Sequence, residues 1–88
     1  MGIAAHTDGR MEVARERLEE STRLRKEIGF LPGVAANLVG LIYIAVAQDR
    51  SSEAQALLEE ARSIAEACGA HAIMRQVEEA RERLEAAP

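Results

Sequence analysis

Residues 26–38 read KEIGFLPGVAANL and place two glycines and a proline within five positions, between two stretches rich in helix-forming residues. Gly29 follows Ile28 at a point where a residue of positive φ commonly ends a helix. Pro32 comes three positions later and supplies the φ that suits the first turn of a new helix. The segment therefore predicts that one helix ends, the chain turns, and a second helix begins.

The composition of the whole chain favours helices throughout. Its 88 residues suffice for one modest domain but not for a large enclosed active site. The hydrophobic residues are mostly aliphatic, with one Phe, one Tyr and no Trp, and this mixture favours helix over strand. Fifteen acidic and eleven basic residues are interleaved, which argues against a surface that binds nucleic acid. We expect a single all-α domain over residues 1–88.

The sequence contains no segment suited to entering a membrane. The longest apolar stretch, residues 34–47, is interrupted by Asn37 and is too short to span a bilayer. The start, MGIAAHTDGR, lacks the basic residues and the sustained apolar run of a signal peptide. Cys68 has no second cysteine with which to form an internal disulfide. We therefore expect a cytoplasmic protein without a membrane-spanning segment.

Four segments repeat apolar and small residues at steps of three and four, the spacing that lines one face of a helix. The predicted helices span about residues 10–28, 33–47, 52–68 and 71–86. The first helix is expected to bury Met11, Ala14, Leu18, Ser21, Leu24 and Ile28.

The ends of these helices have recognisable capping residues. Thr7 or Asp8 can accept hydrogen bonds from the free amides at the start of the first helix. Ser52 and Gln55 have the spacing of a capping box for the third helix. Gly69 is expected to end that helix, as a glycine just past the last helical residue commonly does.

The second predicted helix is apolar almost all the way round, so it must be covered on more than one side. One stripe consists of Val34, Leu38, Leu41, Ile42 and Ala45, and another of Val39, Tyr43 and Val46. The fourth helix differs, because its only apolar stripe is narrow and is surrounded by charged and amide side chains. That stripe consists of Ile73, Val77, Ala80 and Leu84.

The sequence repeats itself at an offset of 40 residues. Residues 14–29, ARERLEESTRLRKEIG, align with residues 54–69, AQALLEEARSIAEACG, with five identities in sixteen positions. A period of this length in an all-helical chain predicts stacked helical hairpins. The identical pairs are Ala14 with Ala54, Leu18 with Leu58, Glu19 with Glu59, Glu20 with Glu60, and Gly29 with Gly69.

Residues 37–69, NLVGLIYIAVAQDRSSEAQALLEEARSIAEACG, resemble one tetratricopeptide repeat of the long variety found in bacterial transcriptional regulators and signalling ATPases. Ala54, Ala61 and Leu58 match two small positions and one large position of the family's second helix, and Leu41 matches the leucine of its first helix. Asp8 to Ile28 resemble the turn and second helix of a preceding unit. The resemblance implies antiparallel hairpins stacked as a short superhelix of about four helices.

Several positions depart from the family pattern. Ile42 and Asp49 stand where glycines are usual, and Ala45 stands where a tyrosine is usual. Arg81 occupies the place of a buried leucine, so the last helix is expected to act as a solvating cap. Only one full unit is present, and fewer than three repeats are marginal for a solenoid on its own. The chain is therefore expected either to be part of a larger array or to self-associate.

The resemblance also implies peptide binding on the inner surface of the first helices, which in this register presents Asn37, Val39, Tyr43 and Val46. The family's clamp for a peptide carboxylate needs Lys and Asn there, and apart from Asn37 the positions hold Val, Gly, Tyr and Ala. Hydrophobic contact with a partner helix or peptide is therefore predicted instead. The open alternative is that the four residues are buried against a second copy or a neighbouring repeat.

The spacing of reactive residues predicts no catalytic site, no metal site and no cofactor. His6 and His71 lie 65 positions apart without a nucleophile or a third ligand beside them, so they are interpreted as surface residues. Cys68 continues the apolar stripe of its helix and is expected to be buried or half-buried. Adjacent glutamates do not face each other on a helix. The three Glu-Glu pairs are therefore interpreted as solvated residues on helix surfaces. Those pairs are Glu19–Glu20, Glu59–Glu60 and Glu78–Glu79.

We predict a protein-protein interaction module, not an enzyme, that binds a partner helix or peptide through an apolar face. Homodimerisation is expected because the helix over 34–47 has more apolar surface than two neighbouring helices cover. The alternative is a self-assembling structural unit with no external ligand. A third hypothesis, an enzyme or small-ligand sensor, lacks convergent polar groups in the sequence.

Overall fold

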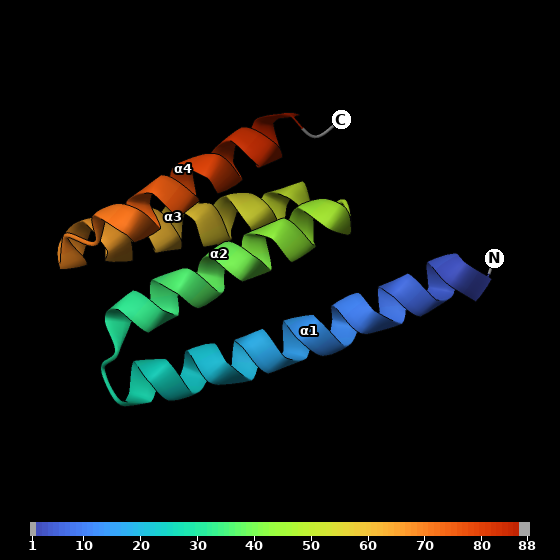
Figure 1. The fold of residues 1–88 in the computed structure, drawn as a ribbon, viewed down its shortest axis with the longest axis horizontal. Helices are drawn as coiled ribbons and strands as arrows, with labels where there is room; N and C mark the ends of the chain where they lie inside the picture. Colours follow the sequence, from blue (N-terminus) through green and yellow to red (C-terminus); the bar gives the residue numbers. More distant parts are fainter. Residues whose placement is uncertain (1, 87–88) are drawn as a thin grey trace.

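The computed structural model describes residues 2–86, with side chains described from residue 9 onward (Figure 1). This range forms an all-α fold with no strand, and each helix runs antiparallel to the one before it (Figure 1). The all-α fold predicted from the composition and the periodicity is confirmed. The helices are α1 (Gly2–Glu27), α2 (Leu31–Ala47), α3 (Ser51–Cys68) and α4 (His71–Ala86).

The three turns between the helices have the same shape and follow one another at intervals of 20 residues. Gly29, Asp49 and Gly69 adopt the left-handed conformation, with φ of 76°, 60° and 65°. In each turn the next residue donates its backbone N–H to the carbonyl five positions earlier. These bonds join Phe30 to Arg25 at 2.8 Å, Arg50 to Ala45 at 2.8 Å and Ala70 to Ala65 at 3.1 Å. The helix ends predicted at Gly29 and Gly69 are confirmed.

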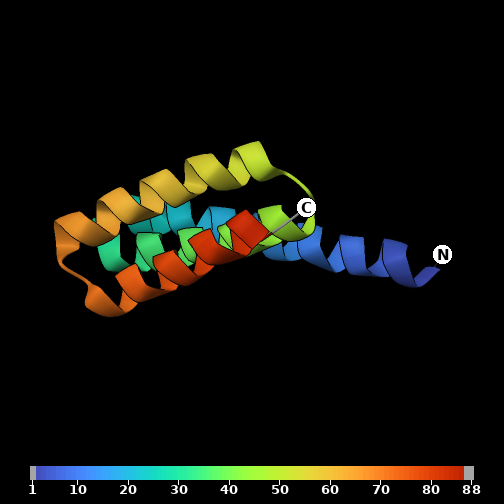
Figure 2. The ribbon, with the colours of Figure 1, turned by 90° about the horizontal axis from the view of Figure 1, so that it is seen from above.

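Helix α2 is the centre of the molecule, because it packs against α1, α3 and α4 (Figure 2). Its side chains are buried round most of its circumference, and so the prediction that it needs cover on more than one side is confirmed. Gly40 allows the approach of α1, since a Cβ at this position would meet Leu18 Cδ1 at 3.1 Å. The buried hydrophobic residues of α2 are Val34, Ala35, Leu38, Val39, Leu41, Ile42 and Ala45.

Helix α3 contributes a row of small residues to the core. Ala54, Ala61 and Ala65 are fully buried, and Leu58 is almost fully buried between them. Small side chains at this spacing let the axes of two helices approach closely. Each buried apolar side chain stabilises the fold in proportion to the apolar area that it removes from water. From α4, Val77 and Ala80 complete the core.

Two predictions about helix starts are wrong. Helix α1 begins at Gly2 instead of near residue 10, and its backbone stays helical through Gly9, which lowers helix stability but does not break the helix. The side chains of Thr7 and Asp8 lie outside the described ones. Helix α3 begins at Ser51 with Arg50 as the preceding residue, and no side chain caps it. The turn at Asp49 already sets this start, so Ser52 lies inside the helix and not at its cap.

The predicted buried face of α1 is only half correct. Met11, Leu18 and Ser21 are partly buried, whereas Ala14 is exposed and Leu24 is 48% exposed. Ile28 lies beyond the end of the helix and is also exposed. Helix α2 is the principal neighbour of α1, and one neighbour covers only one side of a helix. The apolar stripe predicted from the sequence is wider than that side.

Asp49 offers a direct test of the turn geometry. A non-glycine residue in the left-handed region costs about 1 kcal/mol, which glycine avoids. We expect Asp49→Gly to raise the free energy of unfolding by about 1 kcal/mol in urea titrations followed by circular dichroism. The matched control, Gly29→Ala, should lower it by a similar amount. Destabilisation by Asp49→Gly would contradict the geometry of this turn.

Candidate interaction surfaces

The four residues predicted to contact a partner do not form one exposed surface. The Asn37 side chain is 9% exposed and donates a hydrogen bond to Ser21 Oγ of α1 at 3.0 Å. Val39 is 7% exposed and Val46 is half-buried, while Tyr43 is 40% exposed. Because successive helical residues are rotated by about 100°, Asn37 lies on the opposite side of α2 from the other three. Of the four, Tyr43 is the side chain most available to a partner.

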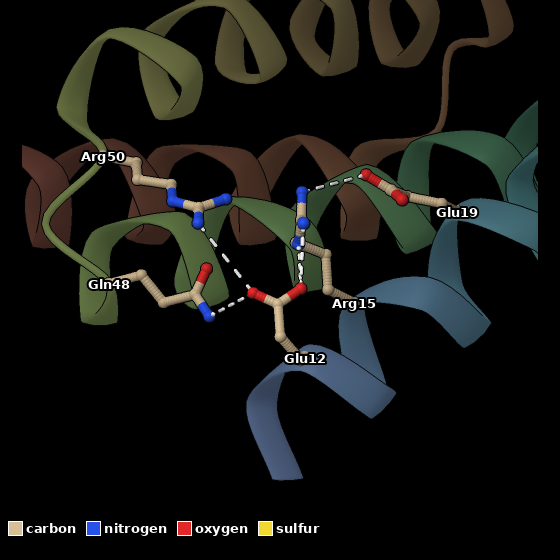
Figure 3. Close-up of polar contacts among 5 residues, drawn as sticks. All are labelled: Glu12, Arg15, Glu19, Gln48 and Arg50. Carbon is tan, nitrogen blue, oxygen red and sulfur yellow. Dashed lines mark hydrogen bonds and ion pairs between the residues drawn. The ribbon is translucent and has the colours of Figure 1, made fainter. Parts of the chain in front are cut away.

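A polar cluster joins α1 to the turn between α2 and α3 (Figure 3). The Glu12 carboxylate accepts hydrogen bonds from Arg15 at 2.8 Å and from the Gln48 side-chain amide at 3.3 Å. Arg50 comes within 3.9 Å of the same carboxylate, and Arg15 also reaches Glu19 at 3.5 Å. The cluster therefore holds residues 12 and 48 together, although 36 positions separate them in the sequence.

The hydrogen bond from Arg15 is the main reason why the pKa of Glu12 lies below its ordinary value. Desolvation, the second-largest effect, acts in the opposite direction, whereas the charge of Arg15, the hydrogen bond from Gln48 and the charge of Arg50 lower the pKa further. A carboxylate surrounded by donors in this way stays ionised and links two elements. Its local pair with Arg15 follows from helical spacing, but no sequence signal predicts its contact with Gln48.

A cleft of about 670 Å³ lies between α3 and α4. Four apolar side chains, Leu58, Met74, Val77 and Leu84, lie among the residues that line it. The others are polar or charged and come from both helices. They are Gln55, Arg62, Glu66, Glu78, Arg81 and Glu85.

Arg81 is held on the α4 side of this cleft. Its guanidinium lies 2.8 Å from both Glu78 and Glu85, one turn before and one turn after it on the same helix. The hydrogen bond from Arg81 is the main cause of the lowered pKa of Glu78. The sequence predicted Arg81 to be a solvating residue, and the structure adds that it is partly buried and lines a cleft.

The α3–α4 cleft extends along about three turns of α3. On α3 its lining residues run from Gln55 to Glu66, which at 1.5 Å per residue is a length of about 16 Å. Within the chain, the α1–α2 pair already holds a helix, since α3 packs on α2 and its Glu60 pairs with Lys26 of α1 at 2.8 Å. The 40-residue repeat makes α3 and α4 the counterparts of α1 and α2. The described helices leave the corresponding place beside α3 and α4 unfilled.

A second, smaller cleft of about 420 Å³ lies where α1, α2 and α3 meet. Its apolar side chains are Leu38, Leu41 and Leu57, and the Lys26–Glu60 pair belongs to its charged edge. Because α3 already fills most of this place, the second cleft is what remains between three packed helices.

His71 and Cys68 are not among the residues that line these two clefts. His71 is exposed at the first position of α4, as predicted, whereas the side chain of His6 is outside the described ones. The prediction that Cys68 is buried is wrong, because the last turn of α3, Glu66 to Gly69, is exposed beyond the cover of its neighbours. Within residues 2–86 no helix is long and apolar enough to cross a membrane.

No protein-family model matches this chain, and no curated protein or solved structure matches it either. The resemblance to tetratricopeptide repeats therefore depends on the residues quoted above and stays a prediction.

The Glu12 cluster predicts an acid sensitivity of the fold. A carboxyl whose pKa is lower in the folded state stabilises that state above its unfolded pKa, and this stability is lost as the pH falls through the folded pKa. We expect the urea midpoint to fall between roughly pH 5 and pH 3, and Glu12→Gln to make that fall shallower. Glu16→Gln, an exposed change on the same helix, is the control. Equal pH profiles for the two variants would contradict the role of Glu12.

Proposed function

We propose that this chain is a protein-protein interaction module that binds an amphipathic helix of a partner in the α3–α4 cleft. The observation that supports this most directly is the shape and lining of the cleft, which has apolar residues between charged ones along about three turns of helix. The way in which α3 itself lies against α2 and α1 provides an example of such docking within the same molecule.

The lining residues define the chemistry of the proposed partner. An apolar stripe at helical spacing would meet Leu58, Met74 and Leu84 of the cleft. Arg81 is already paired with two glutamates, whereas no ion pair within the described residues involves Arg62 or Glu66. A partner helix with a carboxylate near Arg62 and a basic side chain near Glu66 would complete the charges of the cleft.

The antiparallel helices and the turns at 20-residue intervals support the resemblance to tetratricopeptide repeats. On the basis of that resemblance we propose that Tyr43, with Val46 beside it on α2, forms a second contact with the partner, outside the α3–α4 cleft. Tyrosine is a frequent hot-spot residue in protein interfaces, which supports this assignment. The pKa is lowered for two carboxyl groups, those of Glu12 and Glu78. Each is bonded to an arginine of its own helix, which supports a role in binding over one in catalysis.

The cleft is tested with a displayed library of amphipathic helical peptides selected against the wild-type chain. We expect the enriched peptides to bind Met74→Glu and Arg62→Glu at least about tenfold more weakly, by fluorescence anisotropy, because the first places a charge among apolar residues and the second reverses a charge at the edge. Ala67→Glu, an exposed change on α3 away from the cleft, is the control for folding and net charge.

Two results would overturn the cleft as the binding site. One is the absence of any peptide enriched on the wild-type chain. The other is a loss of binding in Tyr43→Glu while both cleft variants bind normally, which would assign the site to α2 instead.

A further inference from the structure

The large apolar side chains that the structure leaves exposed are concentrated on α1, the turn after it and the first residue of α2. Helix α1 lies at the edge of the molecule, and its N-terminal turns extend past the other helices (Figures 1 and 2). Among the described residues, five of the six exposed large hydrophobic side chains belong to this region, and Tyr43 is the sixth. The five are Val13, Leu24, Ile28, Phe30 and Leu31.

The side of α1 that points away from α2 has the spacing of a coiled-coil seam. Thr22 and Leu18 face α2, and Val13 and Leu24 lie about half a turn round the helix from them. Starting from Val13, steps of three and four along this outer side give a regular series. The series, here called the outer seam, is Arg10, Val13, Arg17, Glu20, Leu24 and Glu27.

The outer seam of one chain is complementary in charge to the outer seam of a second, antiparallel copy. Its midpoint lies between residues 18 and 19, so a two-fold axis there places a second α1 antiparallel to the first. Each basic position then faces an acidic one, and the two apolar positions face each other. The pairs are Arg10 with Glu27, Val13 with Leu24 and Arg17 with Glu20, each formed twice. Beside the seam, Glu16 of one copy lies next to Arg23 of the other.

Two charges at the centre of the outer seam, Arg17 and Glu20, are available for such pairing, whereas Glu27 is already 3.5 Å from Arg23 of its own helix. On the inner side of α1, Arg15 is already bound to Glu12 and Glu19. Arg17 and Glu20 are exposed, and no ion pair within residues 9–86 involves either of them. The seam itself contains these charges as well as Val13 and Leu24, so opposite charges face each other only when the partner helix is antiparallel.

We infer that two copies of this chain associate through their outer seams, with α1 antiparallel to α1 across a two-fold axis near residues 18 and 19. This interface is separate from the α3–α4 cleft, so it does not depend on the proposed binding of a partner helix. It also differs from the surface that the sequence suggested for dimerisation, since α2 is covered by helices of its own chain.

Charge reversal tests this arrangement by sedimentation equilibrium from roughly 10 µM to 1 mM protein. The wild-type chain should pass from 9.6 kDa to twice that mass, and dimerisation should weaken as salt rises from about 0.05 to 0.5 M. Arg17→Glu alone and Glu20→Arg alone should each weaken dimerisation at least about tenfold, because each change places like charges opposite each other twice. Circular dichroism checks that both exposed changes leave the helices intact.

Mixing the two single variants distinguishes this seam from any other contact. In the mixture, acidic residues at positions 17 and 20 of one chain face basic residues at positions 20 and 17 of the other, so a heterodimer should form. The double variant Arg17→Glu with Glu20→Arg should form a homodimer again. A wild-type chain that stays at 9.6 kDa up to 1 mM, single variants that dimerise like wild type, or a mixture that stays monomeric would each overturn the inference.

Discussion

The structure depends on the need to cover helix α2. Its side chains are apolar on nearly every side, and a helix of this kind is stable only when neighbours remove most of its surface from water. Helices α1, α3 and α4 each take one side, which leaves Leu31, Tyr43 and a few small residues exposed. The short turns at Gly29, Asp49 and Gly69 then fix the antiparallel order of the helices.

The two ends of this arrangement differ although the sequence repeats. Helices α1 and α3 are related by the 40-residue offset, but α3 packs against both α2 and α4, whereas α2 is the principal neighbour of α1. At the α4 end, charged residues such as Arg81 surround a partly apolar cleft. At the α1 end, Val13 and Leu24 remain exposed among charged residues, some of which, such as Arg23 and Glu27, are paired with each other. The two ends of the molecule therefore have chemically distinct surfaces.

Burial of apolar side chains stabilises the fold, and electrostatic contacts help to fix how its helices lie against one another. Most of the ion pairs in the described range join residues three or four apart on one helix and form wherever that helix forms. Among the contacts that act across the fold instead are the Glu12–Gln48 hydrogen bond and the Lys26–Glu60 ion pair. Both involve α1, the helix with the least apolar contact, and both help to set its position against the other three.

Local patterns in the sequence determined the all-α fold, the extent of α4 and the turns at Gly29 and Gly69, because periodicity and positive φ act within a few residues. The start of the first helix near Gly9 and the capping box at Ser52 were predicted wrongly, since a capping residue is only a preference and the preceding turn or a continuing helix overrides it. Which side of each helix is covered could not be read from the sequence. The burial of Asn37, the exposure of Leu24 and the α3–α4 cleft depend on how many neighbours each helix has, and only tertiary packing decides that number.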